Sequence, residues 1–242
     1  MGSLGARPSK WCRGAFFAFF LVWLGGCAES NRLVVYADPW LGEFPARALA
    51  AFSAEQPATQ VELRILSSEV VAQRLHYGDP IDIFLCFRPE IMRERGLSRQ
   101  IAAEMVLADL DLVVVAPRVE IRQPKLGAIN CQSLPADGRP LQRYIADWSD
   151  APEDSCTVTA DFCRQTQDYL LRGWTGRGIL PGFFARRHAD RLEILRAGPS
   201  YSGAFTALKI SETPHRSPAV DFMKFLATKK CQSLLAEENI IE

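Results

Sequence analysis

The sequence predicts an α/β fold in which a mostly parallel sheet carries helices on both faces. From residue 33 to residue 117, short apolar runs typical of strands alternate with helical patterns, and this order favours parallel strands joined by crossover helices. Residues 81–87 (IDIFLCF) are apolar almost throughout, as in strands that are covered on both faces. The 242 residues, 48% of them hydrophobic, are enough to give one large domain, or each of two smaller lobes, a core.

The regular pattern begins with two strands separated by a helix. Residues 33–37 (LVVYA) form an apolar run, and residues 61–66 (VELRIL) alternate apolar with polar side chains, so a strand is expected in each place. A helix is expected from about Glu43 to Glu55, where apolar side chains recur at helical spacing, and Pro57 ends it.

Two adjacent serines mark the start of the next helix. Ser67 and Ser68 stand where the second strand gives way to a helical pattern that ends near Gly78. A serine hydroxyl satisfies an unpaired amide at a helix start, so at least one of the two is expected to cap this helix. A helix start with two hydroxyls also suits an anion, and contact with a ligand is the alternative interpretation.

The remainder of the chain continues these two patterns. Helical patterns cover three further segments, at about 90–95, 159–172 and 219–237. Strand-like runs cover three more, at 111–117, 126–130 and 201–210. No repeat, low-complexity run or heptad pattern interrupts them.

The first 26 residues predict an export signal. Three cations precede an apolar run over residues 15–24, which is too short to cross a bilayer comfortably, since that takes about 20 apolar residues. The small residues before Cys27 resemble a bacterial lipobox, which implies cleavage before Cys27 and lipid attachment to its thiol; an uncleaved anchor and a plain signal are the alternatives. Cleavage removes three cations and no acid, which leaves 25 basic and 28 acidic residues, a net charge of −3.

The cysteines of the mature chain do not define a disulfide or a metal site. Beyond Cys12 and Cys27, five remain: Cys86, Cys131, Cys156, Cys163 and Cys231. An exported compartment permits disulfides, but an odd number leaves at least one thiol unpaired, and the pairing stays open. The spacing of Cys156 and Cys163 matches no zinc pattern.

No residue pattern indicates catalysis, a metal or a cofactor, and none is expected. The sequence has no Gly-x-Ser-x-Gly, His-Glu-x-x-His or phosphate-cradling glycine motif. His76, His188 and His215 are too scattered for a metal site, and each is expected at the surface. The formal charge of zero argues against a nucleic-acid partner, because such binders neutralise phosphates with an excess of cations.

Three segments carry a resemblance to a known family. They are residues 33–52 (LVVYADPWLGEFPARALAAF), 67–87 (SSEVVAQRLHYGDPIDIFLCF) and 107–118 (LADLDLVVVAPR). Their order and spacing resemble the periplasmic molybdate-binding proteins of ABC transporters, a branch of the type II solute-binding fold. The resemblance implies two α/β lobes joined by two hinge crossings, with the ligand in the cleft between them.

The resemblance also implies a division of the chain. After the signal peptide at 1–26 and a lipidated linker at 27–32, residues 33–115 and 203–242 would form lobe 1, and residues 116–202 would form lobe 2. A monomer is expected outside the cytoplasm, tethered to the membrane by its lipid and working with an ABC permease.

In this family, serine hydroxyls, amides at helix starts and a tyrosine hydroxyl hold the oxyanion. Carried over by position, the resemblance places Trp40, beside Asp38, at the first serine and keeps Ser67 or Ser68 as the second. A third contact falls in the turn at 134–138, and proline stands at the tyrosine position. The candidate ligand-binding residues are therefore Asp38, Trp40, Ser67, Ser68, Ala136, Asp137 and Pro181.

These departures change the expected ligand chemistry. A buried dianion that loses one charged-type hydrogen bond forfeits about 1.5–3 kcal/mol, roughly tenfold or more in affinity. Asp38, Glu69 and Asp137 also place negative charges in the three turns that are expected to face the ligand, and these charges would repel an anion. The ligand expected from the resemblance is an oxyanion such as molybdate or tungstate, with key hydroxyl donors replaced. Trp40 either stacks on a ring or sugar or packs between the lobes.

Three classes of function follow from the sequence. The first is a lipid-anchored solute-binding protein of an ABC import system. The second is a lipoprotein that keeps the fold as a sensor or interaction module. The third, least supported because no local motif accompanies it, is a hydrolase on this scaffold that would use Cys131 and a histidine.

Overall fold

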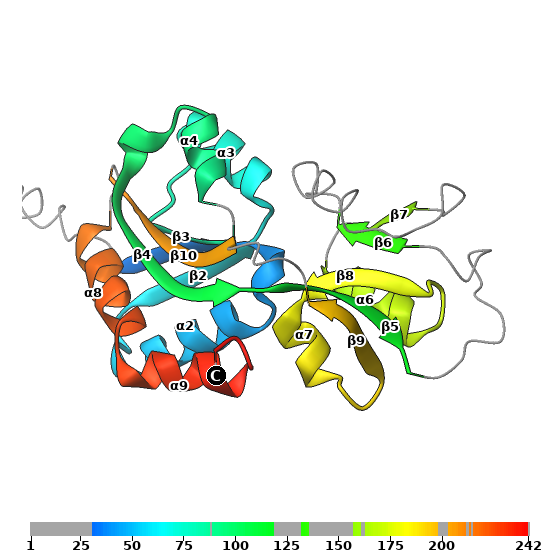
Figure 1. Ribbon diagram of the computed structural model, residues 1–242. Coiled ribbons are helices and arrows are strands. Elements are labelled where there is room, and N and C mark those ends of the chain that lie inside the picture. Colours follow the sequence, from blue (N-terminus) through cyan, green and yellow to red (C-terminus); the bar gives the residue numbers. More distant parts are fainter. Residues whose placement is uncertain are drawn as a thin grey trace, which may run out of the picture.

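The protein was analysed as a computed structural model, which describes residues 31–87, 89–118, 132–135, 157–160, 163–197, 203–211, 213 and 215–241. Within these residues the strands form two five-stranded sheets, each with helices packed against it (Figure 1). The expected α/β fold of two lobes is therefore confirmed.

The first lobe has the strand order β2-β1-β3-β10-β4. Its strands are β1 (Arg32–Ala37), β2 (Gln60–Ile65), β3 (Ile83–Cys86), β4 (Ile101–Leu110) and β10 (Gly203–Ile210). Its helices are η1 (Pro39–Leu41), α2 (Phe44–Glu55), α3 (Ser68–His76), α4 (Glu90–Glu94), η2 (Ser98–Gln100), α8 (Arg216–Leu226) and α9 (Lys229–Glu237).

Helices cover both faces of this first sheet, as the sequence predicts. In Figure 1, α3 and α4 lie on one side and α2, α8 and α9 on the other. Alternate residues of β1 enter the two cores: Leu33 and Val35 pack in the cluster that includes Phe52, whereas Tyr36 packs in the cluster that includes Val71. The four residues of β3 are all buried, which explains their unbroken apolar sequence.

The second lobe has the strand order β7-β6-β8-β5-β9. Its strands are β5 (Leu112–Pro117), β6 (Gln132–Pro135), β7 (Thr157–Ala160), β8 (Arg177–Pro181) and β9 (Leu192–Ala197). Its helices are α6 (Cys163–Leu171) and α7 (Gly182–Arg187).

The sheets are evenly mixed rather than mostly parallel. In the first, β1 runs parallel to β2 and β3, but β10 runs antiparallel to β3 and β4. In the second, β6 runs parallel to β7 and β8, but β5 runs antiparallel to β8 and β9. The mixture has a topological reason, because β4 leaves the first lobe and β10 returns to it, so the two must run in opposite directions.

Several elements differ from the sequence expectations. Residues 101–110 carry no clear pattern, yet they form β4. The helix expected at 219–237 is two helices, because Thr228 interrupts it and its hydroxyl accepts the Cys231 N–H at 3.3 Å to cap α9. α6 begins at Cys163, after the short strand β7, and the strand expected at 126–130 lies outside the described residues.

The chain crosses from the first sheet to the second at Asp111, earlier than the lobe boundary expected after residue 115. In Figure 1, β4 runs on into β5 as one long ribbon. Asp111 is held to α7 twice. Its carbonyl accepts the Gly182 N–H at 2.9 Å, and its carboxylate pairs with Arg186 at 3.0 Å.

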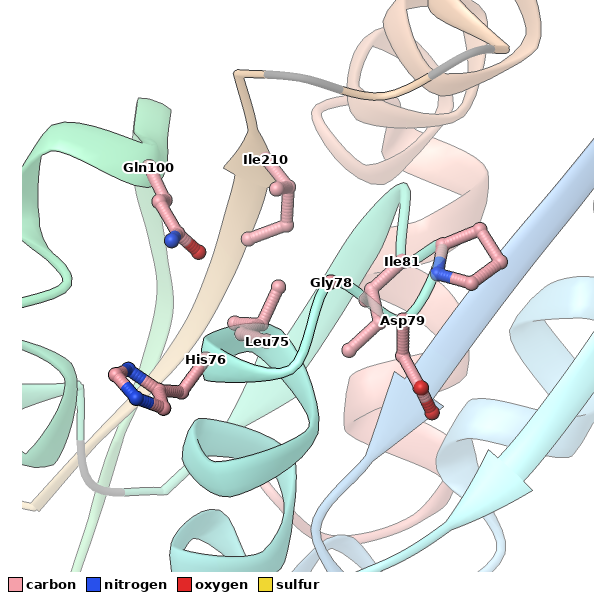
Figure 2. Close-up of a pocket in the computed structure, with 8 residues that line it drawn as sticks. Leu75, His76, Gly78, Asp79, Ile81, Gln100 and Ile210 are labelled. Carbon is pink, nitrogen blue, oxygen red and sulfur yellow. The ribbon is translucent and has the colours of Figure 1, made fainter.

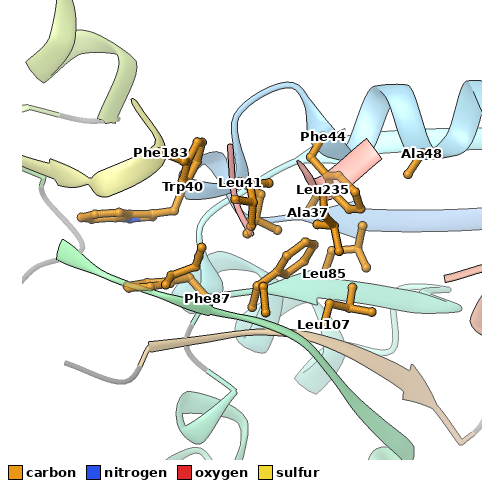
Figure 3. Packing of buried hydrophobic residues seen from close by; sticks show 14 of the residues in the cluster. Ala37, Trp40, Leu41, Phe44, Ala48, Leu85, Phe87, Leu107, Phe183 and Leu235 are labelled. Carbon is orange, nitrogen blue, oxygen red and sulfur yellow. The ribbon is translucent and has the colours of Figure 1, made fainter. Parts of the chain in front are cut away.

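The two lobes share one buried apolar cluster. Trp40 and Leu41, from the turn after β1, pack in the same cluster as Phe183 and Phe184 of α7 (Figure 3). Gly42 lies at this contact with φ of +60°, and a Cβ there would come within 3.3 Å of Phe184. Because a side chain at Gly42 would be strained in itself and would also meet α7, the close approach of the lobes requires glycine.

We expect Gly42→Ala to lower the free energy of unfolding by about 1–3 kcal/mol, because its backbone conformation strongly favours glycine and the new methyl group meets Phe184. Gly96→Ala is the control, since Gly96 also has a positive φ but has nothing within 4 Å of a Cβ. Urea denaturation measures both variants. Equal losses in the two would show that contact between the lobes contributes nothing at Gly42.

Candidate functional site

The candidate site lies at the carboxyl ends of β1, β2 and β3. These strands are parallel, so the segments that follow them meet at one edge of the first sheet, the edge where open α/β sheets bind ligands. The turns are tied to neighbouring strands, because the Asp38 N–H donates to the Leu85 carbonyl at 2.9 Å and the Leu66 N–H donates to the Ala37 carbonyl at 3.0 Å. The backbone therefore holds Asp38 close to Ser68.

The carboxylate of Asp38 is buried and hydrogen-bonded through both oxygens. Its side chain precedes η1, and Oδ1 accepts the Trp40 N–H at 3.0 Å. Its Oδ2 accepts the hydroxyl of Ser68 at 2.7 Å. Asp38 is only 3% exposed, so this carboxylate is a fixed part of the edge rather than a mobile surface group.

The two serines behave differently from the capping expectation. Ser67 takes the N-cap position of α3 with an extended backbone, but its side chain makes no capping hydrogen bond. Ser68 is the first residue of α3 and is buried, and its hydroxyl is directed to Asp38 instead. The prediction that a serine hydroxyl caps α3 is therefore wrong. A charged acceptor forms the stronger bond and so takes the hydroxyl.

Trp40 packs inside the protein. It is 2% exposed and stacks on Phe87, with ring centroids 5.2 Å apart and an interplanar angle of 12°. Figure 3 shows this pair beside Phe183 of the second lobe. The sequence left two interpretations of Trp40 open, stacking on a ring or sugar of the ligand and packing between the lobes. The structure supports packing between the lobes.

The other candidate residues are placed only in part. Pro181 is buried at the end of β8, where α7 begins, and brings no hydroxyl to that position. Ala136, Asp137 and the lipidation candidate Cys27 lie outside the described residues. The structure thus brings Asp38, Trp40, Ser67 and Ser68 together and leaves the remaining contacts as predictions.

A buried polar cluster that the sequence does not reveal joins β3 to the start of α8. The carboxylate of Asp82, fully buried, accepts the Val34 N–H at 2.6 Å and the hydroxyl of Thr213. Nδ1 of His215 lies 3.0 Å from the same carboxylate. Burial raises the pKa of Asp82, against the opposing effects of the Val34 N–H and His215.

His215 is therefore not the surface residue that its sequence context predicts. It is 8% exposed, because it pairs with a carboxylate more than 130 positions away. His76 is exposed, as expected, and His188 is half-buried. The one available signal was Asp82 itself, a charged residue inside an apolar run, which indicates a buried group in need of partners.

A separate pocket of about 540 Å³ lies at the opposite edge of the first sheet (Figure 2). It sits beyond the end of α3 and before β3 begins, and its lining residues are Leu75, His76, Gly78, Asp79, Pro80, Ile81, Gln100 and Ile210. Its volume suits a small molecule. It shares no residue with the candidate site, and Asp79 at its rim is already paired with Arg74 at 2.8 Å.

Two further observations concern metals and membranes. Across the described ranges, no three His, Cys, Asp or Glu side chains gather as a metal ion would require. In the same part of the chain, no helix has the length and apolar character needed to cross a membrane.

Cys86 and Cys231 are free and buried. Burial, reinforced at Cys86 by the charge of Asp38, raises the pKa of that thiol well above its ordinary value, and burial raises the pKa of Cys231 to about 12. Since the thiolate is the nucleophile, neither thiol is suited to catalysis. Cys131, the candidate for a hydrolase, lies outside the described residues.

Solved structures with the same arrangement of lobes include binding proteins and a regulatory domain. The periplasmic molybdate-binding protein of Azotobacter vinelandii is 15% identical, with a TM-score of 0.64 over 87% of this chain and 99% of that one. The tungstate ABC transporter structure from Geobacter sulfurreducens is 11% identical, with a TM-score of 0.61 over 85% and 98%. The CcmR regulatory domain of Synechocystis, in complex with 2-PG, is 16% identical, with a TM-score of 0.63 over 82% and 97%.

These likenesses establish the fold. The chain has the two-lobe fold of periplasmic binding proteins, and at 11–16% identity the match says nothing more about its ligand. No protein-family model matches the chain, and no curated protein matches its sequence.

Cys86 and Cys231 are expected to resist alkylation in the native protein. At about pH 8 almost none of either thiol is ionised, because burial raises both pKa values. Brief exposure to iodoacetamide, followed by peptide mass mapping, should find both cysteines unmodified in buffer and modified in urea. Native labelling of either at the rate of a free thiol would contradict this assignment.

We expect Asp82→Asn to change how stability depends on pH. Because the pKa of Asp82 is raised above 3.8 in the folded state, that state binds the proton more tightly than the unfolded chain does. This residue's contribution to stability therefore falls as pH rises through the interval just above 3.8.

The asparagine variant should lose that contribution, so its unfolding free energy should fall less over this interval than that of the wild type. Asp221→Asn is the control, because the Asp221 side chain is 43% exposed and pairs with the nearby Lys224. Urea titrations across the acid range measure the slopes. An identical slope for wild type and Asp82→Asn would contradict the prediction.

Proposed function

We propose that this protein is the solute-binding component of an ABC import system. In this proposal it is exported, anchored through a lipid on Cys27, and delivers a small ligand from the cleft between its lobes to a permease. The observation that carries the proposal is a two-lobe fold in which three parallel strands end at one edge with a cluster of buried polar groups. Structures of this fold at similar TM-scores include molybdate and tungstate binding components of transporters.

The connections between the lobes suit a binding protein that closes. The chain passes from the first lobe to the second at Asp111 and returns between β9 and β10. Two crossings between the lobes allow a hinge motion. A ligand that contacts both lobes stabilises the closed state, and a permease can distinguish that state from the open one.

The candidate ligand contacts are those predicted from the resemblance. Asp38, Trp40, Ser67 and Ser68 belong to the first lobe and Pro181 to the second, while Ala136 and Asp137 lie outside the described residues. An oxyanion is the ligand implied by the resemblance, but Trp40 and Pro181 stand where hydroxyl donors are expected. We therefore propose a small solute as the ligand, without specifying an oxyanion.

A non-transport sensor is the second candidate. Its support is the CcmR regulatory domain, a structure of the same fold that carries a bound small molecule and belongs to a regulator. The two candidates differ in their consequences for the cell. Loss of a transport component reduces uptake of the ligand, whereas loss of a sensor leaves uptake intact and changes a response to it.

A ligand screen by thermal shift tests whether the protein binds a small molecule, which both proposals assume. A true ligand at a hundred times its dissociation constant stabilises by about 2.7 kcal/mol, which raises the melting temperature by roughly 5–10 °C in a protein of this size. Molybdate, tungstate, sulfate, phosphate, amino acids and sugars form the panel.

The double variant Ser67→Ala/Ser68→Ala should bind the ligand found at least tenfold more weakly, because it removes the Ser67 hydroxyl from the candidate edge and the hydrogen bond that holds Asp38 there. Ser233→Ala is the matched control, because its hydroxyl bonds only within α9, far from the candidate edge. Calorimetric titration compares the three proteins. Equal affinity in the double variant and the control would remove the serine turn from the site, and a panel without any stabilising compound would count against solute binding.

A further inference from the structure

We propose that the carboxylate of Asp38 occupies the position that a bound oxyanion would take in the proposed cleft between the lobes. This carboxylate takes the hydrogen-bond donors that a free oxyanion would use, so the cleft selects a ligand that is uncharged or cationic at this end. The inference rests on the proposed function, because it concerns the chemical class of the solute. It makes Asp38 the residue that determines specificity.

The first step is the set of donors at this edge. An oxyanion at such a place is held by hydroxyls and by amides near a helix start. Both kinds are present here, as the Ser68 hydroxyl and the Trp40 N–H, and both donate to Asp38, at 2.7 and 3.0 Å. Each oxygen of the carboxylate takes one of them.

The second step is that the carboxylate cannot swing aside. Pro39 follows it and restricts the backbone, while the Asp38 N–H is bound to the Leu85 carbonyl of β3. Its neighbour Trp40 is fixed by its stack on Phe87. These restraints, together with the two hydrogen bonds of the carboxylate, hold Asp38 in its position.

The third step is charge and space. Asp38, Trp40 and Ser68 are each no more than 3% exposed, so a second anion cannot reach the same donors without displacing the carboxylate. An anion beside it would meet like charge in a desolvated setting, which opposes binding. The charge of Asp38 also contributes to the raised pKa of the Cys86 thiol, so its field extends to the end of β3.

Removal of the carboxylate should therefore uncover an oxyanion site. In Asp38→Ala, the Ser68 hydroxyl and the Trp40 N–H lose their acceptor and leave a space about the size of formate. We expect formate to raise the melting temperature of this variant, while sodium chloride at equal ionic strength does not. Wild-type protein should not respond to formate beyond the chloride control.

Asp38→Gly removes the same carboxylate, and it serves if the alanine variant does not fold. By calorimetric titration we expect it to bind formate at least tenfold more tightly than the wild type. Asp38→Asn keeps a side chain of the same shape in that position, so it should show no such gain. Asp82→Asn is a further control, because it neutralises another buried carboxylate of the same lobe at the opposite end of β3. It should gain no affinity for formate.

The outcomes separate this inference from the proposed function. Micromolar binding of molybdate or sulfate by the wild type overturns the inference and supports solute binding. A lack of gain for formate in both Asp38→Ala and Asp38→Gly also overturns it, whatever the panel finds for the wild type. A gain in these two variants, with no panel compound bound by the wild type, supports the inference about Asp38 and counts against solute binding as the natural function.

Discussion

The pairing of β10 with β3 and β4 is the interaction on which the rest of the structure depends. β10 follows the second lobe in the sequence and lies between β3 and β4 of the first sheet. The first sheet is therefore completed by a strand that comes after the whole second lobe in the chain. The helices that follow it, α8 and α9, then cover the face of that sheet where α2 lies. This return brings the end of the chain beside the second lobe, where the Arg187 guanidinium of α7 pairs with Glu238.

Glu238 shows what this arrangement requires electrostatically. Its side chain is 1% exposed, and a buried carboxylate is costly unless cations compensate it. Arg47 of α2 approaches it at 2.5 Å, and Arg187 approaches it from the second lobe. One carboxylate thus joins both lobes, beside the apolar contact of Gly42 with Phe183 and Phe184.

The sequence predicts the parts of this fold that local patterns determine, and it misses those determined by distant contacts. α2 has a clear apolar stripe and β3 an unbroken apolar run, so both are found where expected. β4 is largely exposed over its first half, so its residues show no strand alternation, and its partner β10 lies about a hundred positions away. The burial of His215 and the direction of the Ser68 hydroxyl likewise depend on carboxylates brought in by the fold.

The same distinction applies to the candidate site. Resemblance places Asp38 and Ser68 at one edge, but only the folded arrangement shows the carboxylate accepting the Trp40 N–H and the Ser68 hydroxyl. Buried donors need an acceptor, since an unsatisfied one costs about 1–3 kcal/mol. In a typical oxyanion-binding protein this cost falls on the empty state and is relieved when the ligand enters. Here the chain supplies its own acceptor, so the empty site is already satisfied. A ligand that binds must therefore gain its free energy from other groups, and the contacts of the second lobe gain importance accordingly.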